Sequence, residues 1–259
     1  EIVDLAKIDE ESQTMLDIRG GKIGMIFQEP MTALSPVHTI GEQLIEAILL
    51  HQQLSKRAAR DLGIEMLRKA GIPRAEQRID DYSYQLSGGL RQRAMIAIAL
   101  CNRPALLTAL DVTIQAQILR LIKELQAEYA MAVMIITHDL GVIARMANEV
   151  AVMYRGRVVE FAAVNTIFHH PKHPYTKALL RSIPKVDAPR TDRLLSIRGT
   201  VPEPFALVPG CPFHPRCDWM IDGLCNVGAP PTLTTVGVDH RVACVLETEG
   251  SMHHVQPVH

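Results

Sequence analysis

The chain has 259 residues, of which 47% are hydrophobic and 21% charged, so it can form one large domain or two smaller domains with buried cores. Its formal net charge is −1 and only 4% of its residues are aromatic, so we expect no nucleic-acid partner. No apolar run approaches membrane-spanning length and the first residues show no signal-peptide pattern, so we expect a soluble protein.

The first part of the chain predicts one strand followed by helices. Residues 23–27 form a short apolar strand pattern that ends at Gln28. Residues 37–80 are polar with apolar residues at helical spacing, and they predict helices that include residues 56–70. Gly71 follows that second helix and is a typical stop signal.

Residues 86–93 read Leu-Ser-Gly-Gly-Leu-Arg-Gln-Arg and open an apolar helical stretch. Ser87, Gly88 and Gly89 are therefore predicted at a helix N-terminus, where unpaired backbone N–H groups and the positive end of the helix dipole face outward. The glycines let a ligand approach the backbone, and the serine hydroxyl adds a donor. The arrangement suits a phosphate group, although it is also a common loop and helix cap.

The later part of the chain alternates between helix and strand patterns, which predicts an α/β core with a parallel sheet. Arg155-Gly156 separates two strand patterns and predicts a hairpin. The predicted elements are a helix at 116–130, a strand at 133–137, a helix at 140–147 and strands at 150–154 and 157–160. Beyond Phe161 the chain is rich in proline, so we expect a domain at 1–160 and a loop-rich extension at 161–259.

Polar side chains follow the predicted strands. Gln28 ends the first strand, and His138 follows the strand at 133–137, at the end of an open α/β sheet where ligands bind. A neutral amide such as that of Gln28 can ligate Mg²⁺ or orient a water. Asp111 precedes a predicted helix and fits its N-cap. Each of these residues also has an ordinary structural explanation when taken alone.

Taken together, the motifs resemble those of a known family. Residues 25–32, 86–93, 109–118 and 137–139 resemble, in this order, the Q-loop, signature, D-loop and switch-histidine motifs of ABC-transporter ATPases. The residues of these motifs resemble the form found in importers of peptides, nickel and similar solutes. Residues 173–180 resemble a phrase that follows the ATPase domain in peptide-type importers.

The resemblance implies that the protein binds ATP and Mg²⁺ and hydrolyses ATP to drive solute import. It gives catalytic roles to Gln28 and His138, with His138 bonded to the γ-phosphate and helping to hold the attacking water. The residues implied to contact nucleotide are Ser87, Gly88, Gly89, Gln92 and Asp111.

The implied fold is a RecA-like α/β ABC ATPase core with a helical subdomain at about 31–101, followed by the C-terminal extension. The implied partners are a second ATPase subunit, identical or homologous, that sandwiches two ATP molecules head to tail, and two transmembrane permease subunits. A solute-binding protein would act indirectly. The implied location is peripheral, at the cytoplasmic face of the inner membrane.

Two motifs of the family are absent from this sequence. Gly21-Lys22 is followed by Ile23, so no G-x-x-x-x-G-K-[ST] phosphate loop is present. Leu107 runs directly into Thr108, where the family carries about six further residues with the Walker B Asp and catalytic Glu. Because such a loss should damage a central strand, we favour segments missing from this sequence over a truncated protein or a subunit that has lost hydrolysis.

The main functional alternative is a subunit that has lost hydrolysis, namely a regulatory or structural ABC-type subunit. An ABC protein of DNA repair or translation fits less well, because the phrase at 173–180 and the cysteine-rich tail point to importers. The native gene discriminates between the alternatives, according to whether it encodes a phosphate loop before Glu1 and an Asp-Glu pair after Leu107.

Four of the five cysteines lie near the C-terminus with spacing C-x₅-C-x₇-C-x₁₈-C, and the fifth, Cys101, is expected to be inert packing in a core helix. Without a secretory signal, a metal site is favoured over disulfides. A [4Fe-4S] cluster, Zn²⁺ and free buried thiols all stay open, and the resemblance favours the cluster. The candidate ligands are Cys211, Cys217, Cys225 and Cys244.

Overall fold

The computed structural model describes residues 4–110, 116–183, 197–203 and 205–247. Contacts between residues divide the chain into an N-terminal unit, Glu1–Val142, and a C-terminal unit, Ile143–His259. In the described part of the chain, no helix is both long enough and apolar enough to cross a membrane.

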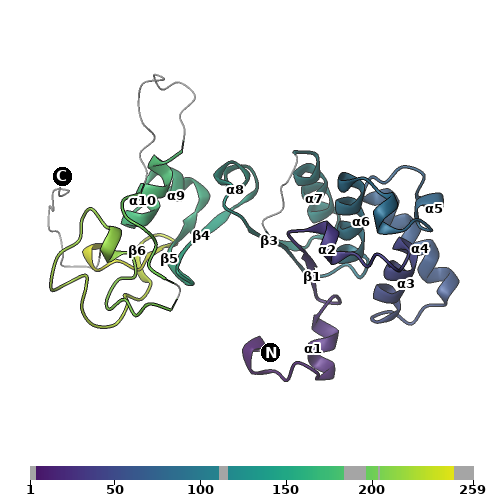
Figure 1. Cartoon of the computed structure of the whole chain (residues 1–259), viewed down its shortest axis with the longest axis horizontal. Coiled ribbons are helices and arrows are strands. Elements are labelled where there is room, and N and C mark those ends of the chain that lie inside the picture. The colour runs from purple at the N-terminus through teal and green to yellow at the C-terminus, as the bar shows by residue number, and fades with distance from the viewer. Residues whose placement is uncertain (1–3, 111–115, 184–196, 204, 248–259) are drawn as a thin grey trace, which may run out of the picture. The chain divides into compact units, whose positions relative to one another are not determined.

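The N-terminal unit contains a three-stranded parallel sheet (Figure 1). Its order is β1-β2-β3, with Ile23 paired to Leu106 and Leu106 to Ala132. The strands are β1 (Ile23–Ile26), β2 (Leu106–Leu110) and β3 (Ala132–Ile136). The predicted parallel sheet and its two outer strands are thus present.

The central strand β2 is continuous, contrary to the expectation that a loss after Leu107 would damage it. Leu107, Thr108 and Ala109 are all buried, and Thr108 and Ala109 pair with residues of both neighbouring strands. The expectation was wrong because a strand needs only backbone partners on each side and small or apolar side chains. Residues 108–110 meet both requirements, since their backbone pairs with neighbouring strands and their side chains are small or apolar.

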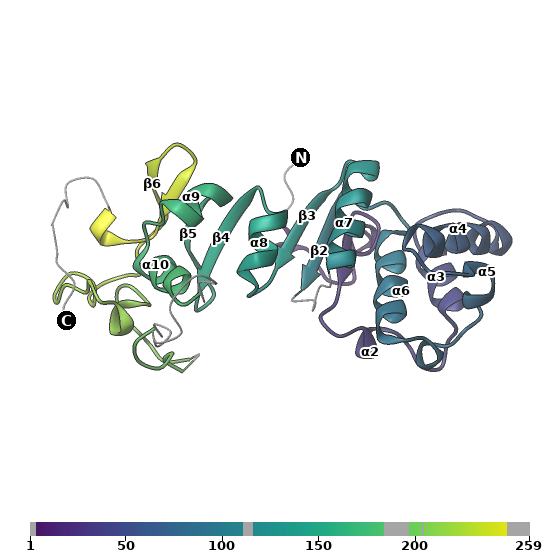
Figure 2. The same cartoon turned by 90° about the horizontal axis from the view of Figure 1, so that it is seen from above.

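Helices α3, α4, α5 and α6 contact one another in the N-terminal unit and lie together in Figure 2. Thr39 and Glu42 form a reciprocal capping box that starts α3, and Ser55 caps α4. Gly71 follows α4 with φ +77°, as its stop-signal role requires. The helices are α1 (Gln13–Ile18), α2 (Pro30–Ala33), α3 (Ile40–Leu49), α4 (Lys56–Lys69), α5 (Ala75–Arg78), α6 (Gly88–Leu100) and α7 (Ala116–Tyr129).

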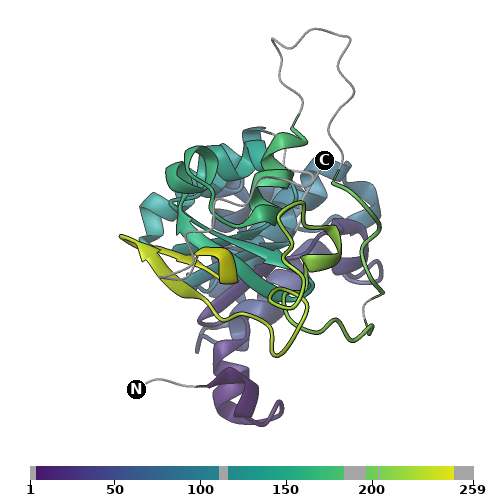
Figure 3. The same cartoon turned by 90° about the vertical axis from the view of Figure 1, so that its left-hand side faces the viewer.

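The C-terminal unit is built on an antiparallel sheet of order β4-β5-β7-β6, whose last two strands form the yellow hairpin in Figure 3. The predicted hairpin turn is confirmed, since Arg155 and Gly156 have φ values of 47° and 73°. The strands are β4 (Glu149–Tyr154), β5 (Arg157–Ala163), β6 (Thr234–Gly237) and β7 (His240–Val242). The helices after β3 are α8 (Leu140–Met146), α9 (Val164–His169) and α10 (Pro174–Arg181).

The division between the units falls earlier than the predicted domain boundary at 160/161, which lies inside β5. The buried faces of β4 and β5 pack against Cys211, Phe213 and Cys217 of the C-terminal segment in one apolar cluster. The hairpin therefore shares its core with the extension. The predicted domains and the helical subdomain at about 31–101 stay predictions.

Candidate functional site

Two predicted catalytic residues lie at the same edge of the parallel sheet. Gln28 follows the carboxyl end of β1, and His138 follows the carboxyl end of β3. Both residues are exposed. Because β1 and β3 flank β2 and run in the same direction, the two side chains project from one edge, which is where α/β sheets bind ligands.

The turn that carries His138 is fixed by its neighbours. The Asp139 backbone N–H donates to Thr137 Oγ1 at 3.1 Å. Asp139 Oδ1 accepts from the backbone N–H groups of Gly141 at 2.7 Å and Val142 at 3.1 Å, at the start of α8. The histidine is therefore presented on a short, hydrogen-bonded connection between a strand and a helix.

The predicted phosphate-binding residues form the exposed N-terminus of α6. Ser87 is the N-cap, and its Oγ accepts from the backbone N–H of Leu90 at 3.4 Å. A Cβ added at Gly88 or Gly89 would meet no atom within 4 Å. The 13-residue helix thus directs its N-terminal amides and dipole toward open space, where an anion is favoured.

The segment after Gln28 is joined to this helix. Helix α2 contacts α6, and the Ser83 hydroxyl donates to the Ser35 carbonyl at 3.3 Å. Arg91 of the octet donates through Nε to the Ser83 carbonyl at 2.7 Å, and Arg93 donates to the Ala70 carbonyl at 2.7 Å. Both arginines hold neighbouring backbone in place.

Two further residues, Gln92 and Asp111, were predicted to contact nucleotide, and neither is described as part of the exposed N-terminus of α6. Gln92 is only 8% exposed, and its Nε2 is buried without a hydrogen-bond partner among the described residues. The side chain therefore lies inside the N-terminal unit, unlike Ser87 at the start of the same helix. Asp111 lies outside the described residues, so its predicted role stays a prediction.

The four C-terminal cysteines line one small cavity in the C-terminal unit. Its walls include Cys211, Cys217, Cys225 and Cys244, all buried and none in a disulfide. The Cys211 N–H donates to the Cys225 carbonyl at 2.8 Å, which joins two of the three contributing segments. Gly210 permits this approach, because a Cβ there would lie 2.3 Å from the same carbonyl oxygen.

The space between these thiols is small, about 10 Å³, or roughly the room that one water needs. Burial raises the pKa of Cys217 and of Cys244 to about 12, so both are protonated thiols at neutral pH when no metal is bound. Among the described residues, no three or more His, Cys, Asp or Glu side chains form a group that could hold a metal ion. The predicted metal site is thus not formed for an ion in this structure.

Cys101 is separate, as predicted. It lies at the C-terminal end of α6 in the N-terminal unit and is 2% exposed. Its Sγ donates to the Ile98 carbonyl at 3.1 Å, and burial raises its pKa to about 12. These are the properties of an unreactive packing residue.

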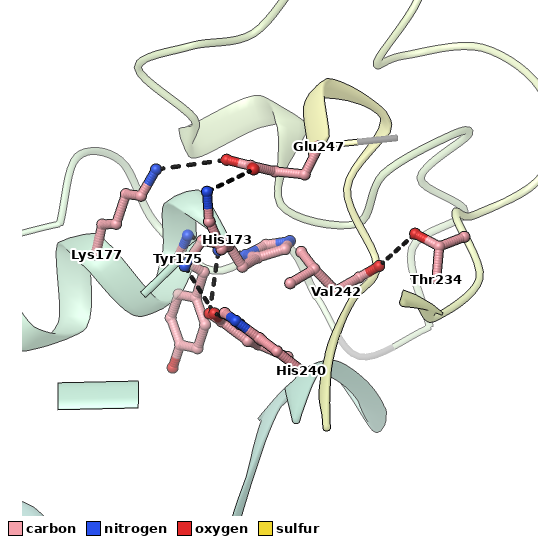
Figure 4. A network of polar contacts seen from close by, with 9 residues as sticks. His173, Tyr175, Lys177, Thr234, His240, Val242 and Glu247 are labelled. Atoms are coloured by element: carbon pink, nitrogen blue, oxygen red, sulfur yellow. Dashed lines mark hydrogen bonds and ion pairs between the residues drawn. The ribbon is translucent and has the colours of Figure 1, made fainter. Parts of the chain in front are cut away.

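A buried polar network that the sequence did not predict lies beside the thiol cavity (Figure 4). Glu160 is fully buried and accepts from the backbone N–H groups of Lys172 at 2.7 Å and His173 at 3.1 Å. His240 Nε2 lies 2.8 Å from Glu160 Oε1. The network joins β5, β7 and the start of α10, and its sequence signal was a charged residue inside the apolar run Val158–Ala163 of β5.

Comparisons with known proteins agree with the motifs. The family model described as "ABC transporter" matches residues 3–111, and that described as "Oligopeptide/dipeptide transporter, C-terminal region" matches residues 159–225. The oligopeptide transport ATP-binding protein AppD of Bacillus subtilis is 49% identical over 90% of this chain and 73% of its own length. The oligopeptide transport ATP-binding protein OppD of Mycobacterium tuberculosis is 48% identical over 89% of this chain and 39% of its own length.

Solved structures show the same fold. A dimeric post-hydrolysis state of the ATP-binding cassette MJ0796, bound to ADP and Pi, matches with a TM-score of 0.53 and 28% sequence identity. The match covers 61% of this chain and 68% of the other. The motifs, their positions on the sheet and α6, and these similarities lead to one conclusion: the chain belongs to the ATP-binding proteins of ABC transporters, in the group that carries the oligopeptide/dipeptide C-terminal region.

Proposed function

We propose that this ATP-binding subunit hydrolyses ATP to drive peptide import, with Gln28 and His138 at the reacting phosphate. The observation that carries the proposal is that both residues follow strands flanking β2 at one edge of a parallel sheet. Mg-ATP supplies the phosphoryl group when bound. The neutral Gln28 amide suits a Mg²⁺ ligand or a water-orienting group, and His138 can hydrogen-bond the γ-phosphate.

The exposed start of α6 has a different part in the proposal. Ser87, Gly88 and Gly89 would contact the γ-phosphate of an ATP bound mainly by a second ATP-binding subunit. Their openness supports this, because no described atom of the same chain lies within 4 Å of a Cβ added at either glycine. The dimeric state named for MJ0796 supports a paired arrangement.

Peptides as the cargo are supported by the names of AppD and OppD, which are oligopeptide transport proteins. The remaining partners would be two transmembrane permeases and, indirectly, a solute-binding protein. The protein would dock on the permeases at the cytoplasmic face of the membrane, through surfaces near Gln28 and the helices around α6.

The test of the reaction is His138→Ala in the product of the native gene. We expect ATP turnover to fall by about 100-fold or more while ATP binding is kept, because the γ-phosphate loses one hydrogen bond and the attacking water loses a partner. Turnover is measured as phosphate release and binding as retention of labelled ATP. His169→Ala, at an exposed histidine of α9, is the control. Undiminished turnover in His138→Ala would remove His138 from the mechanism.

We further propose that Cys211, Cys217, Cys225 and Cys244 together bind a [4Fe-4S] cluster with a structural role. Four buried thiols around one cavity are a suitable donor set for such a cluster, and thiolates are also the ligands of structural zinc. The cavity of about 10 Å³ is smaller than a cluster, so the surrounding side chains would move outward on loading. Binding would cross-link the three segments of the chain that carry the cysteines, at 211–217, 225 and 244.

The test is anaerobic purification followed by analysis for iron, sulfide and zinc. We expect a brown protein with broad absorption near roughly 400 nm and iron in excess of zinc. Cys101→Ser should keep its iron, whereas Cys217→Ser should lose it. A colourless protein loaded with zinc would keep the shared site and overturn the cluster.

A further inference from the structure

A second pocket in the C-terminal unit lies next to the thiol cavity, and Pro174 and Phe213 belong to the walls of both. Its volume is about 120 Å³. A protein cavity of roughly 150 Å³ is known to take up benzene, so this pocket has room for most of a small organic molecule. Its described walls include Arg181, Arg198 and Arg216 and none of the cysteines.

The pocket carries a surplus of positive charge. Asp218 is the one acidic residue among its described walls, and its Oδ1 lies 3.8 Å from Arg198 Nε. Three guanidinium groups against one carboxylate leave two positive charges without a counterion in the pocket. An anion bound there would be attracted by charges that the fold has already brought together.

Arg181 is the arginine most available to a ligand. It is exposed in the last turn of α10, and no described residue forms a hydrogen bond or an ion pair with it. Its guanidinium carbon lies 5.4 Å from the centre of the Trp219 ring. Lys177, one turn earlier in α10, is paired with Glu247 at 3.7 Å (Figure 4). Because like charges one turn apart on a helix repel, an anion beside Arg181 would relieve that repulsion.

Arg216 is held in place by its neighbours. Its Nε donates to the Arg198 carbonyl at 3.0 Å, and its two terminal nitrogens donate to Tyr154 Oη at 3.4 Å and to the Ile197 carbonyl at 3.5 Å. These bonds use three of the five N–H groups of the guanidinium and leave two for a ligand. Arg216 is therefore a donor whose position does not have to change on binding.

The base of the pocket is aromatic. Phe213 is buried, and its ring centre lies 5.3 Å from that of Tyr154 and 5.4 Å from that of Tyr175. Trp219 adds a second aromatic wall. Sites for small organic ligands combine apolar surface of this kind with a few polar groups that fix orientation. The walls therefore suit an anion with a flat apolar body better than an inorganic ion.

We propose that this pocket binds a small organic carboxylate, with the carboxylate at Arg181 and Arg198 and the apolar body against Phe213 and Trp219. Guanidinium groups pair with carboxylates through two parallel hydrogen bonds, which fixes the orientation of the ligand. The site is separate from the residues proposed to act on ATP and from the four thiols, so its occupation does not depend on either.

The test uses the full chain and benzoate, a carboxylate on a ring of benzene size. Trp219 is the one tryptophan of the chain and lines the pocket, so benzoate should change its fluorescence saturably. Benzamide has the ring without the charge, and acetate has the charge without the ring. Each should bind at least about tenfold more weakly than benzoate. Calorimetry measures the same affinities without relying on the fluorescence.

Two variants test the arginines. Arg181→Gln and Arg198→Gln remove a charge at exposed positions, so we expect an unchanged urea midpoint and about tenfold weaker binding of benzoate in each. Arg145→Gln is the matched control, because Arg145 is an exposed arginine of α8 that does not line the pocket. It should bind benzoate like the wild-type protein.

Three results would overturn the site: no saturable binding of benzoate, equal binding of benzamide, or wild-type affinity in both Arg181→Gln and Arg198→Gln. Inorganic phosphate is the remaining probe. If phosphate binds as tightly as benzoate, the apolar walls contribute nothing and the assignment to organic carboxylates is wrong.

Discussion

Residues of one short motif face different environments. In the octet at 86–93, Ser87, Gly88 and Gly89 are exposed at the start of α6, whereas Gln92 is buried within the unit. The difference follows from helical geometry, since residues one turn into a helix face the core when the helix is apolar on that side. The three exposed residues thus remain the strongest candidates for phosphate contact.

Gly89 allows a test of that contact. In Gly89→Asp we expect an intact fold and near-normal ATP binding, because open space surrounds the position, but loss of solute uptake by cells carrying the whole transporter. The reason is that a carboxylate would be placed against the triphosphate when two subunits close. Gly89→Asn has nearly the same size without the charge and should keep more uptake. Full uptake by Gly89→Asp would show that this helix start does not meet ATP.

At the level of elements, the buried carboxylate of Glu160 connects separate segments of the C-terminal unit. It lies on β5 and bonds the chain before α10 and His240 of β7. A buried carboxylate with these partners determines which segments meet, because any other arrangement leaves it unpaired. Apolar packing around Phe213 is less specific in this respect.

Glu160→Ala should lower the free energy of unfolding of the C-terminal unit by about 3–5 kcal/mol, since it leaves His240 and two backbone N–H groups without a partner. Glu160→Gln keeps an acceptor and should cost about 1–3 kcal/mol. The exposed Glu149 of β4 is the matched control, with Glu149→Ala expected within about 0.5 kcal/mol of wild type.

Urea unfolding followed by the fluorescence of Trp219 measures this order. Trp219 is the one tryptophan of the chain and packs against the apolar cluster of the C-terminal unit, so its signal reports that unit. If Glu160→Ala and Glu149→Ala unfold at the same urea concentration, the network does not stabilise the unit.

At the level of the whole molecule, the chain has two units, and each carries a different candidate site. The candidate nucleotide residues that the structure describes belong to the N-terminal unit, and the thiol cavity belongs to the C-terminal unit. The stability of each unit depends on its own buried contacts. A metal bound at the thiols should therefore stabilise only the C-terminal unit.

Hydrogen exchange tests this separation. When the metal is removed with a chelator, amide exchange should rise in residues 205–247 and stay unchanged in β1, β2, β3 and α6, because all four cysteines lie in the C-terminal unit. If metal removal accelerated amide exchange equally in both units, or left exchange in residues 205–247 unchanged, the prediction of separate stabilities would be wrong.

Local sequence patterns were enough to predict many of the helices and strands and the family. Periodicity and caps located α3, α4, α6, α7 and α8, and the strand patterns located β1, β3, β4 and β5. These signals are local, since a capping residue or an alternating run acts within a few positions of the chain. Four motifs in order then identified the ABC family, because their wording is specific even where their spatial relation is unknown.

Which residues come together depends on tertiary packing. It extended β2 through Thr108–Leu110, placed the β4–β5 hairpin in the core of the C-terminal unit, and buried Gln92. It also brought the four cysteines to one cavity with His173 beside them. These facts depend on contacts between residues far apart in the chain, so the burial of a polar side chain such as that of Gln92 could not be predicted from its neighbours in the sequence.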